Sequence, residues 1–411
     1  MIAYHFPPLA GSSGIQRTLR FVQHLPALGW QPIVLSADPR AYEQTSNDLM
    51  SDVPAGTVVN RAFALDTARH LNIKGRYLGW MARPDRWISW RFDAIRQGMQ
   101  LIREHQPDVI WSTYPIATAH VIAQALHRKT GIPWVADFRD PMAQDGYPAD
   151  PVTWRSYQRI EEEALTQASC SVFTTPGAAR IYQERYPAAA AKVRVLENGY
   201  DEESFSTGHA KEPAPSVQAP GRPLVLLHSG IVYPSERDPT QLFEALSRLK
   251  AKATLKNGDI LIRFRASVHD DLLTALANQY GVSEFIETAP SVPYRQALAE
   301  MLAVDALLVM QASNCNAQIP AKIYEYLRAG RPIIGLTDPV GDTAGVLRAA
   351  GLNSIARLDS ADEIEALLPA FLEAVRNGAA TLPTAAAVRQ ASRKGRSEAL
   401  VQLLDGLSAS A

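Results

Sequence analysis

The sequence has few cysteines, almost no net charge and no long apolar run, and each shortage excludes a class of protein. Its 411 residues include two cysteines, Cys170 and Cys315, without the spacing of a metal site. Two cysteines are too few for a disulfide framework, which favours a reducing cytoplasm. The formal net charge of −1 argues against a nucleic-acid partner held by bulk electrostatics.

Membrane-spanning and targeting segments are also missing. No apolar stretch approaches the roughly 20 residues of a spanning helix, and the start, MIAYHFPPLAGSSG, lacks the features of a signal peptide. We therefore expect a cytoplasmic protein that touches a membrane only peripherally, at its inner face. The strand expected over residues 2–6 begins almost at the first residue, so we also expect the natural start to lie slightly upstream.

Two common nucleotide-binding fingerprints are absent as well. Gly11 and Gly14 do not form G-x-G-x-x-G, and G-x-x-x-x-G-K-[ST] does not occur. The turn that contains Gly11, Ser12 and Gly14 still lets a ligand approach the backbone closely. A plain tight turn explains the same residues, and both interpretations stay open.

What is present is an alternation of short apolar strands and amphipathic helices, which restarts halfway. Such a pattern predicts an α/β fold with parallel sheets, and the length exceeds one core, so we expect two domains. We assign residues 1–206 to the first domain and 224–385 to the second. The Pro-, Gly- and Ala-rich residues 207–223 form the predicted linker, and a C-terminal helix over 386–411 is expected to return to the first domain.

The most informative stretch is residues 318–336, QIPAKIYEYLRAGRPIIGL. It follows the apolar run 305–310, which predicts a buried strand, and Pro320 suits the first position of a helix. Such a helix directs its free N–H groups into the crevice where parallel sheets bind ligands. Lys322 can bind a phosphate there, and Glu325, on the same face, can bind a vicinal diol. An ordinary surface ion pair between the two is an equal alternative.

Two other strand ends carry polar groups. Ser229 and Gly230 offer backbone N–H groups, and Arg237 a cation, to the same diphosphate. Asp137 and Asp140 follow another predicted strand and suit sugar-hydroxyl contacts or acid–base work. An internal Asp–Arg ion pair is the alternative for these carboxylates.

Residues 61–96 are rich in Lys and Arg and contain Trp80, Trp87 and Trp90. Basic residues with interfacial aromatics suit a surface that lies on anionic lipid or holds a lipid-diphosphate acceptor. A helix that packs its tryptophans into the core is the somewhat favoured alternative, because tryptophan is usually buried.

The order of these features resembles the GT-B glycosyltransferases of family four over essentially the whole chain. The segment 6–17, FPPLAGSSGIQR, looks like the first glycine loop of that family. The segment 198–205, NGYDEESF, looks like its interdomain signature, and 320–332, PAKIYEYLRAGRP, looks like its donor-site helix.

The resemblance implies two Rossmann-like domains that face a cleft, with the donor held mainly by the second and the acceptor by the first. It implies that Glu325 binds ribose, that Arg237 and Lys322 neutralise the leaving diphosphate, and that Asp137 contacts the transferred sugar. The same comparison makes further residues part of the ligand site: Gly11, Ser12, Gly14, Ser229, Gly230 and Pro320. Catalysis is expected to be retaining and independent of metal and cofactor, with the nucleoside-diphosphate sugar as co-substrate.

Two positions depart from the family pattern. The usual pair of glutamates, E-x7-E, would place a carboxylate at position 317, where Ala317 stands. The usual G-R-L with a following lysine becomes Gly230-Ile231-Val232 with Arg237. These differences affect recognition of the sugar rather than of the ribose and phosphates.

We therefore expect a glycosyltransferase that moves a sugar from a nucleoside-diphosphate sugar to a saccharide or lipid-linked acceptor. Its expected place is the synthesis of a bacterial-type surface polysaccharide or glycoconjugate, with peripheral contact to anionic membrane through residues 61–96. Two alternatives stay open: a GT-B epimerase acting on sugar nucleotides, and a non-catalytic protein that binds them.

Overall fold

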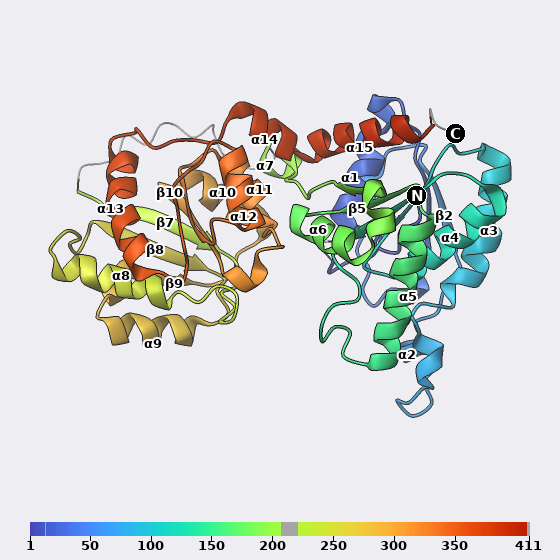
Figure 1. Cartoon of the computed structure of the whole chain (residues 1–411), viewed down its shortest axis with the longest axis horizontal. Coiled ribbons are helices and arrows are strands. Elements are labelled where there is room, and N and C mark those ends of the chain that lie inside the picture. The colour runs from blue at the N-terminus through green and yellow to red at the C-terminus, as the bar shows by residue number, and fades with distance from the viewer. Residues whose placement is uncertain (13, 207–220, 409–411) are drawn as a thin grey trace. The chain divides into compact units, whose positions relative to one another are not determined.

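The chain divides into two compact α/β units in the computed structural model (Figure 1), which describes residues 1–12, 14–206 and 221–408. Unit 1 comprises Met1–Glu197 and the chain from Arg393 onward, and unit 2 comprises Asn198–Ser392. Most of the predicted linker, residues 207–220, lies outside the described residues.

Unit 1 is built on parallel strands that run in the order β2-β1 and β3-β4-β5-β6. Ile2 joins the two parts because it bridges Leu35 on one side and Ser112 on the other. The strand predicted over 2–6 is thus reduced to one bridging residue, because the backbone turns where the Phe6 N–H donates to the Tyr4 carbonyl (3.0 Å). The strands are β1 (Ile33–Ala37), β2 (Val58–Ala62), β3 (Ile110–Thr113), β4 (Trp134–Arg139), β5 (Cys170–Phe173) and β6 (Val193–Val195).

The helices of unit 1 cover two cores, which alternate residues of the central strands fill. On β4, Trp134 and Phe138 belong to the larger core, and Val135 belongs to the core that includes Leu400 on the C-terminal helix. The helices are α1 (Gly14–His24), α2 (Thr67–His70), α3 (Trp90–His105), α4 (Thr118–Thr130), α5 (Pro151–Gln167), α6 (Pro176–Arg185) and α15 (Arg393–Ser408). Short 3-10 segments lie between them at η1 (Pro26–Leu28), η2 (Pro39–Ala41), η3 (Met50–Asp52), η4 (Gly79–Ala82) and η5 (Pro187–Lys192).

Unit 2 has a six-stranded parallel sheet in the order β9-β8-β7-β10-β11-β12. In order along the chain this is 3-2-1-4-5-6, the arrangement of a Rossmann fold, in which ligands bind where the strand order reverses. That point lies between β7 and β10. The strands are β7 (Leu224–Ser229), β8 (Ile260–Arg265), β9 (Ile286–Ala289), β10 (Ala306–Gln311), β11 (Ile333–Thr337) and β12 (Ile355–Ala356).

Alternation along β10 shows why the apolar run at 306–310 is continuous. Leu308 and Met310 pack into a core with α8, α9 and α13, whereas Leu307 and Val309 pack into a core with α10, α11 and α12. A strand buried on both faces must be apolar at every position. The helices are α7 (Glu202–Ser206), α8 (Thr240–Ala251), α9 (Asp270–Tyr280), α10 (Tyr294–Ala303), α11 (Lys322–Ala329), α12 (Asp342–Ala349), α13 (Ala361–Arg376) and α14 (Ala385–Ala391), with η6 (Ser283–Phe285) and η7 (Ser313–Cys315).

The segment that resembles the interdomain signature packs within unit 2. The Tyr200 N–H donates to the Ala391 carbonyl (3.0 Å), and the Tyr200 ring contacts Phe205 edge-on. Glu202 forms an ion pair with Arg328 at the end of α11. Residues 198–206 therefore belong to unit 2, although the sequence assigned them to the first domain.

The predicted C-terminal helix is two helices, because α14 ends at Ala391 and α15 begins at Arg393. The first packs in unit 2. The second lies on unit 1, where Leu400 and Leu404 are buried and the Trp30 indole donates to Asp405 (2.8 Å). Across the described ranges, no helix has the length and apolarity to cross a membrane.

We expect Leu400→Ala to lower the free energy of unfolding by about 2–5 kcal/mol, because it leaves a cavity under α15. Chemical denaturation followed by circular dichroism measures the change. Gln402→Ala, on the exposed side of the same helix, is the control and should change stability by less than about 0.5 kcal/mol. Equal stability of both variants would show that α15 does not complete this core.

Candidate functional site

The switch point of unit 2 gathers the cations that the sequence singled out. Strand β7 ends at Ser229 and leads into Gly230, and the loop after β10 leads into α11. Because β7 and β10 are adjacent and parallel, both turns open at the same edge of the sheet. Lys322, in the first turn of α11, lies so close to Gly230 that a Cβ there would stand 3.2 Å from its Nζ.

The Lys322 ammonium is held by a histidine. Its Nζ lies 3.0 Å from Nε2 of His228, and Nδ1 of the same ring lies 3.1 Å from the Leu308 carbonyl oxygen. A carbonyl can only accept, so Nδ1 carries the proton and the Nε2 lone pair accepts from Lys322. Burial, Lys322 and Arg237 together hold the pKa of His228 well below its usual range, so the ring is neutral.

Two cations share this site without a carboxylate in contact with either. Burial, reinforced by the charge of Arg237, lowers the pKa of Lys322 to about 7, and Glu325 opposes this shift only in part. Arg237 donates from Nη1 to the Ile231 carbonyl (2.8 Å) and lies over the Tyr233 ring, while its buried Nε has no partner. Among the described residues neither cation forms an ion pair, so the site is electrostatically suited to an anion.

Ser229 and Gly230 cannot serve the diphosphate in the way the sequence predicted. The Ser229 N–H donates to the Tyr326 hydroxyl (2.8 Å), and the Gly230 N–H donates to the Arg265 carbonyl (2.8 Å). The prediction of free N–H groups was wrong because Tyr326 on α11 and Arg265 on β8 accept these hydrogen bonds. What Gly230 contributes is space, since its φ of 116° and its missing Cβ leave room beside the lysine.

The N-terminus of α11 also differs from the prediction. The helix begins at Lys322 rather than Pro320, because the Ile323 N–H closes a tight turn on the Pro320 carbonyl (3.0 Å). In the described part of the chain, the N–H groups of Ala321 and Lys322 have no acceptor. They supply the helix-terminal donors that an anion can use.

The simple surface ion pair between Lys322 and Glu325 is not what forms. Lys322 points to His228, and Glu325 accepts a hydrogen bond from the Tyr294 hydroxyl (2.7 Å). The two side chains still share one helix face. The carboxylate is half-buried at the rim of the site.

In unit 1, Asp137 is fully buried at the end of β4 and has both oxygens occupied. Its carboxylate accepts from Nε and Nη2 of Arg17 (2.9 and 3.0 Å) and from the Thr113 hydroxyl (3.0 Å). The internal ion pair considered for this carboxylate therefore exists, although its partner is Arg17 on α1 rather than the neighbouring Arg139. Direct contact between Asp137 and a sugar stays a prediction.

The glycine turn of unit 1 is closely packed by polar side chains. A Cβ on Gly14 would lie 2.4 Å from Nδ1 of His5 and 2.8 Å from Nη1 of Arg139. The Ser12 hydroxyl contacts the same His5 nitrogen (3.1 Å), and Gly11 has a φ of 76°. Burial and the nearby Arg139 lower the pKa of His5 to about 4. The turn therefore requires glycine at position 14 for close approach, which a plain tight turn does not.

His5 and His228 were missed by the sequence reasoning. Each lies near the carboxyl end of the first strand segment of its unit, beside a glycine turn. A histidine at that position, followed by glycine, is the sequence feature from which both could have been found.

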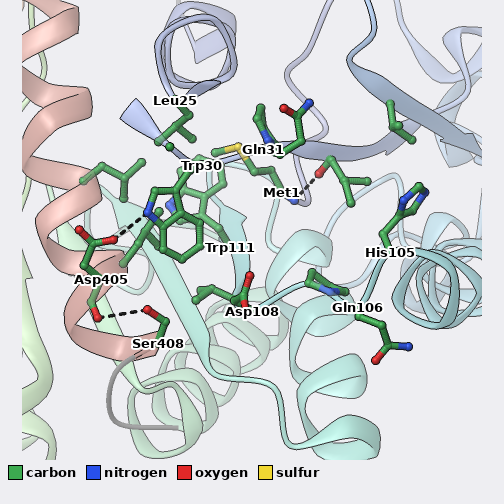
Figure 2. Close-up of a pocket in the computed structure, with 18 residues that line it drawn as sticks. Met1, Leu25, Trp30, Gln31, His105, Gln106, Asp108, Trp111, Asp405 and Ser408 are labelled. Carbon is green, nitrogen blue, oxygen red and sulfur yellow. Dashed lines mark hydrogen bonds between the residues drawn. The ribbon is translucent and has the colours of Figure 1, made fainter. Parts of the chain in front are cut away.

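A cavity of about 620 Å³ in unit 1 is not part of this site (Figure 2). Met1, Ile33 and Val109 line it, so it opens at the amino ends of the strands, whereas Asp137 lies at a carboxyl end. A cavity of about 340 Å³ in unit 2 lies beside Asp238, Asp338 and Asp359. Arg357, the one cation among the described residues that line it, already pairs with Glu363, so the carboxylates make the cavity unsuitable for phosphate.

The comparisons with known proteins agree with this geometry. Residues 13–199 match the family model of the glycosyl transferase 4-like domain. The chain has the GT-B fold of glycosyltransferases. No curated protein matches the sequence significantly.

Solved structures share this fold over nearly the whole length of the chain. A glycosyltransferase from Rickettsia africae is 13% identical with a TM-score of 0.60, covering 99% of this chain and 97% of its own. Anabaena HepE in complex with UDP is 13% identical with a TM-score of 0.62, covering 97% and 98%. Sucrose-phosphate synthase from Thermosynechococcus elongatus is 13% identical with a TM-score of 0.57, covering 100% and 98%. The predicted α/β fold with two Rossmann-like domains is confirmed.

We expect the Lys322 amine to titrate with a pKa of about 7 in the free protein. The Arg237→Gln variant should raise that pKa, because it removes the neighbouring positive charge. NMR of labelled lysine across a pH series measures it, with Lys322→Arg to assign the signal and Arg357→Gln, on the exposed surface, as the control. A pKa near the ordinary lysine value in the unaltered protein would show that the Lys322 amine is not buried beside a second cation.

Proposed function

We propose that this protein is a glycosyltransferase that moves a sugar from a nucleoside-diphosphate sugar to a saccharide or lipid-linked acceptor. The observation that carries the proposal is the pair Lys322 and Arg237, two cations at the switch point of unit 2 that have no carboxylate partner among the residues the structure describes. A diphosphate supplies the missing negative charge.

The roles of the donor-site residues follow from their positions. Lys322 and Arg237 bind the diphosphate, and the free N–H groups of Ala321 and Lys322 at the start of α11 add donors. As the bond between sugar and phosphate breaks, negative charge grows on the diphosphate, and these groups stabilise it in place of a metal ion. Glu325 accepts hydrogen bonds from the ribose hydroxyls, with Tyr294 fixing its orientation.

Unit 1 supplies the acceptor side in this proposal. His5, Ser12 and Arg139 surround the turn at Gly14, and the ion pair of Arg17 with Asp137 fixes α1 against β4. We assign Asp137 first to positioning, because both of its oxygens are occupied. We propose retention of the anomeric configuration and reaction at the cytoplasmic face of a membrane.

Similar structures suggest the first donors and pathways to test. HepE from Anabaena was solved with UDP and with UDP-glucose, and another match is a lipopolysaccharide outer core galactosyltransferase, WaaB. The nucleotides bound to HepE support a uridine donor for this chain, and the activity of WaaB supports a surface glycoconjugate product.

The function is tested by incubating the protein with a panel of UDP-sugars, with and without saccharide and lipid-linked acceptors. Acceptor-dependent release of UDP supports the proposal, and NMR of the product reports whether the linkage is retained. The same reaction in excess chelator tests independence from metal. An epimer formed without acceptor would indicate the epimerase, and binding without turnover would indicate the non-catalytic protein.

Lys322→Met should weaken UDP binding by roughly 10- to 100-fold, since a hydrogen bond to a charged group contributes about 1.5–3 kcal/mol. Glu325→Ala should weaken it too, through the loss of the ribose contact. Isothermal titration calorimetry measures both, with Lys250→Met, a surface lysine paired with Glu284, as the matched control. Affinities close to that of the unaltered protein in both site variants would refute the donor-site assignment.

His228 should act on UDP only through Lys322. His228→Leu is expected to weaken UDP binding about tenfold in the unaltered background and hardly at all in Lys322→Met, because the positioned ammonium is already gone. The double-mutant cycle distinguishes positioning from general loss of structure. Equal losses in both backgrounds would mean that His228 affects binding by another route.

A further inference from the structure

A short turn in unit 1 exposes a row of large apolar side chains. Every residue from Ile73 to Trp80, IKGRYLGW, is exposed. The exposed fraction is 79% for Ile73, 61% for Leu78 and 67% for Trp80, and Tyr77 is 40% exposed. Single exposed apolar residues are ordinary, but four within eight residues call for a partner.

The tip of this 73–80 turn is held by its own backbone. Ile73 and Arg76 exchange hydrogen bonds (2.8 and 3.1 Å), and Lys74 and Gly75 have the positive φ angles of a tight hairpin turn. The Asn72 side chain accepts from the Gly75 N–H (3.0 Å). The turn therefore keeps its shape without burying its apolar side chains.

The base of the turn is anchored to the body of unit 1. The Thr67 hydroxyl donates to the Met81 carbonyl (2.7 Å), and the buried carboxylate of Asp66 pairs with Arg86. Figure 1 shows the chain after α2 as a narrow loop that projects beyond that helix. A fixed base and a fixed tip make the turn a preformed projection.

The charge on the projection has one sign. Lys74 and Arg76 are exposed, residues 71–82 contain no acidic side chain, and neither cation has an ion-pair partner in the described ranges. At the base, the carboxylate of Asp150 is already near Arg83 (3.8 Å). Cations beside exposed Trp, Tyr, Leu and Ile complement a surface that has an apolar interior under an anionic outer layer.

We propose that the 73–80 turn inserts into the interfacial region of an anionic lipid bilayer. Ile73, Leu78 and Trp80 enter the boundary between headgroups and acyl chains, while Lys74 and Arg76 remain at the level of the lipid phosphates. A protein partner fits less well, since a stable protein interface takes about 20–30 residues on each side and the turn offers eight.

Each of the two interpretations of residues 61–96, core packing and lipid contact, applies to different tryptophans. Trp90 is fully buried and Trp87 packs against the core, as the core interpretation requires. Trp80 is the interfacial residue. The chain reaches this turn from the carboxyl end of β2, so the lipid surface meets the edge of the sheet where the acceptor is proposed to bind.

A groove next to the turn has a mixed lining. Tyr77, Arg83 and Arg86 line a cavity of about 510 Å³ together with Asp85 and Asp150. Because Arg83 and Arg86 already pair with Asp150 and Asp66, we assign no ligand to this groove. The membrane contact itself does not depend on the identity of the acceptor.

The test is flotation of the full-length protein with vesicles of phosphatidylcholine alone or with about one third phosphatidylglycerol. We expect binding to the anionic vesicles only. Leu78→Ser with Trp80→Ser should reduce the vesicle partition coefficient at least tenfold, and Lys74→Gln with Arg76→Gln should reduce it roughly thirtyfold at low salt. Val340→Ser with Leu382→Ser, two other exposed apolar sites, both in unit 2, is the control and should bind as the unaltered protein does.

Three results would overturn the proposal. One is absence of binding to anionic vesicles by the unaltered protein, and another is equal binding by all variants. The third is a dimer in light scattering that the turn variants dissociate, which would identify a second copy as the partner. If each variant unfolds at the same temperature as the unaltered protein, a loss of flotation does not reflect misfolding. UDP binding by the same variants should be unchanged, so failure here is distinguishable from failure of the donor-site assignment.

Discussion

The proposed donor site depends on one contact, the hydrogen bond between the Lys322 ammonium and the neutral ring of His228. A carboxylate in that place would satisfy the lysine and leave nothing for a ligand to neutralise. A neutral acceptor fixes the amine's position and leaves its charge uncompensated. The rest of unit 2 serves this arrangement, because Leu308 selects the histidine tautomer, Gly230 leaves space and α11 aims the lysine. An anion that binds beside this amine, whose pKa is about 7, favours its protonated form, so we expect the proposed donor site to bind less tightly as the pH rises above neutrality.

At the corresponding edge of its sheet, unit 1 holds a cation that is paired with a carboxylate. The pair of Asp137 and Arg17 is buried and fully hydrogen-bonded, which makes it costly to break and ties α1 to β3 and β4. Arg139 remains beside the glycine turn, with burial and Arg17 lowering its pKa. One unit thus neutralises its strand-end charge internally, whereas the other keeps it available.

Much of this architecture could be predicted from the sequence, because patterns set by local physics are visible in it. Apolar runs marked the strands that are buried on both faces, and Pro320 with the residues after it marked α11 to within two positions. Contacts between distant segments could not be predicted: the N–H groups of Ser229 and Gly230 were taken as free because Tyr326 and Arg265 approach only in the folded chain. His228 was read as an ordinary strand residue for the same reason. Ala317, where the family pattern has a carboxylate, has no substitute that we can assign from the fold.

The placement of α15 governs how the protein can be made and divided. Unit 1 needs α15 to cover Phe21, Leu25 and Trp111, yet the whole of unit 2 is synthesised in between. During translation this face of unit 1 therefore stays uncovered until α15 has been synthesised. A fragment ending at residue 197 would carry the same exposed apolar face, so unit 1 cannot be obtained as one continuous piece of sequence. Joining the α15 sequence directly to that fragment would supply the helix that covers this apolar face.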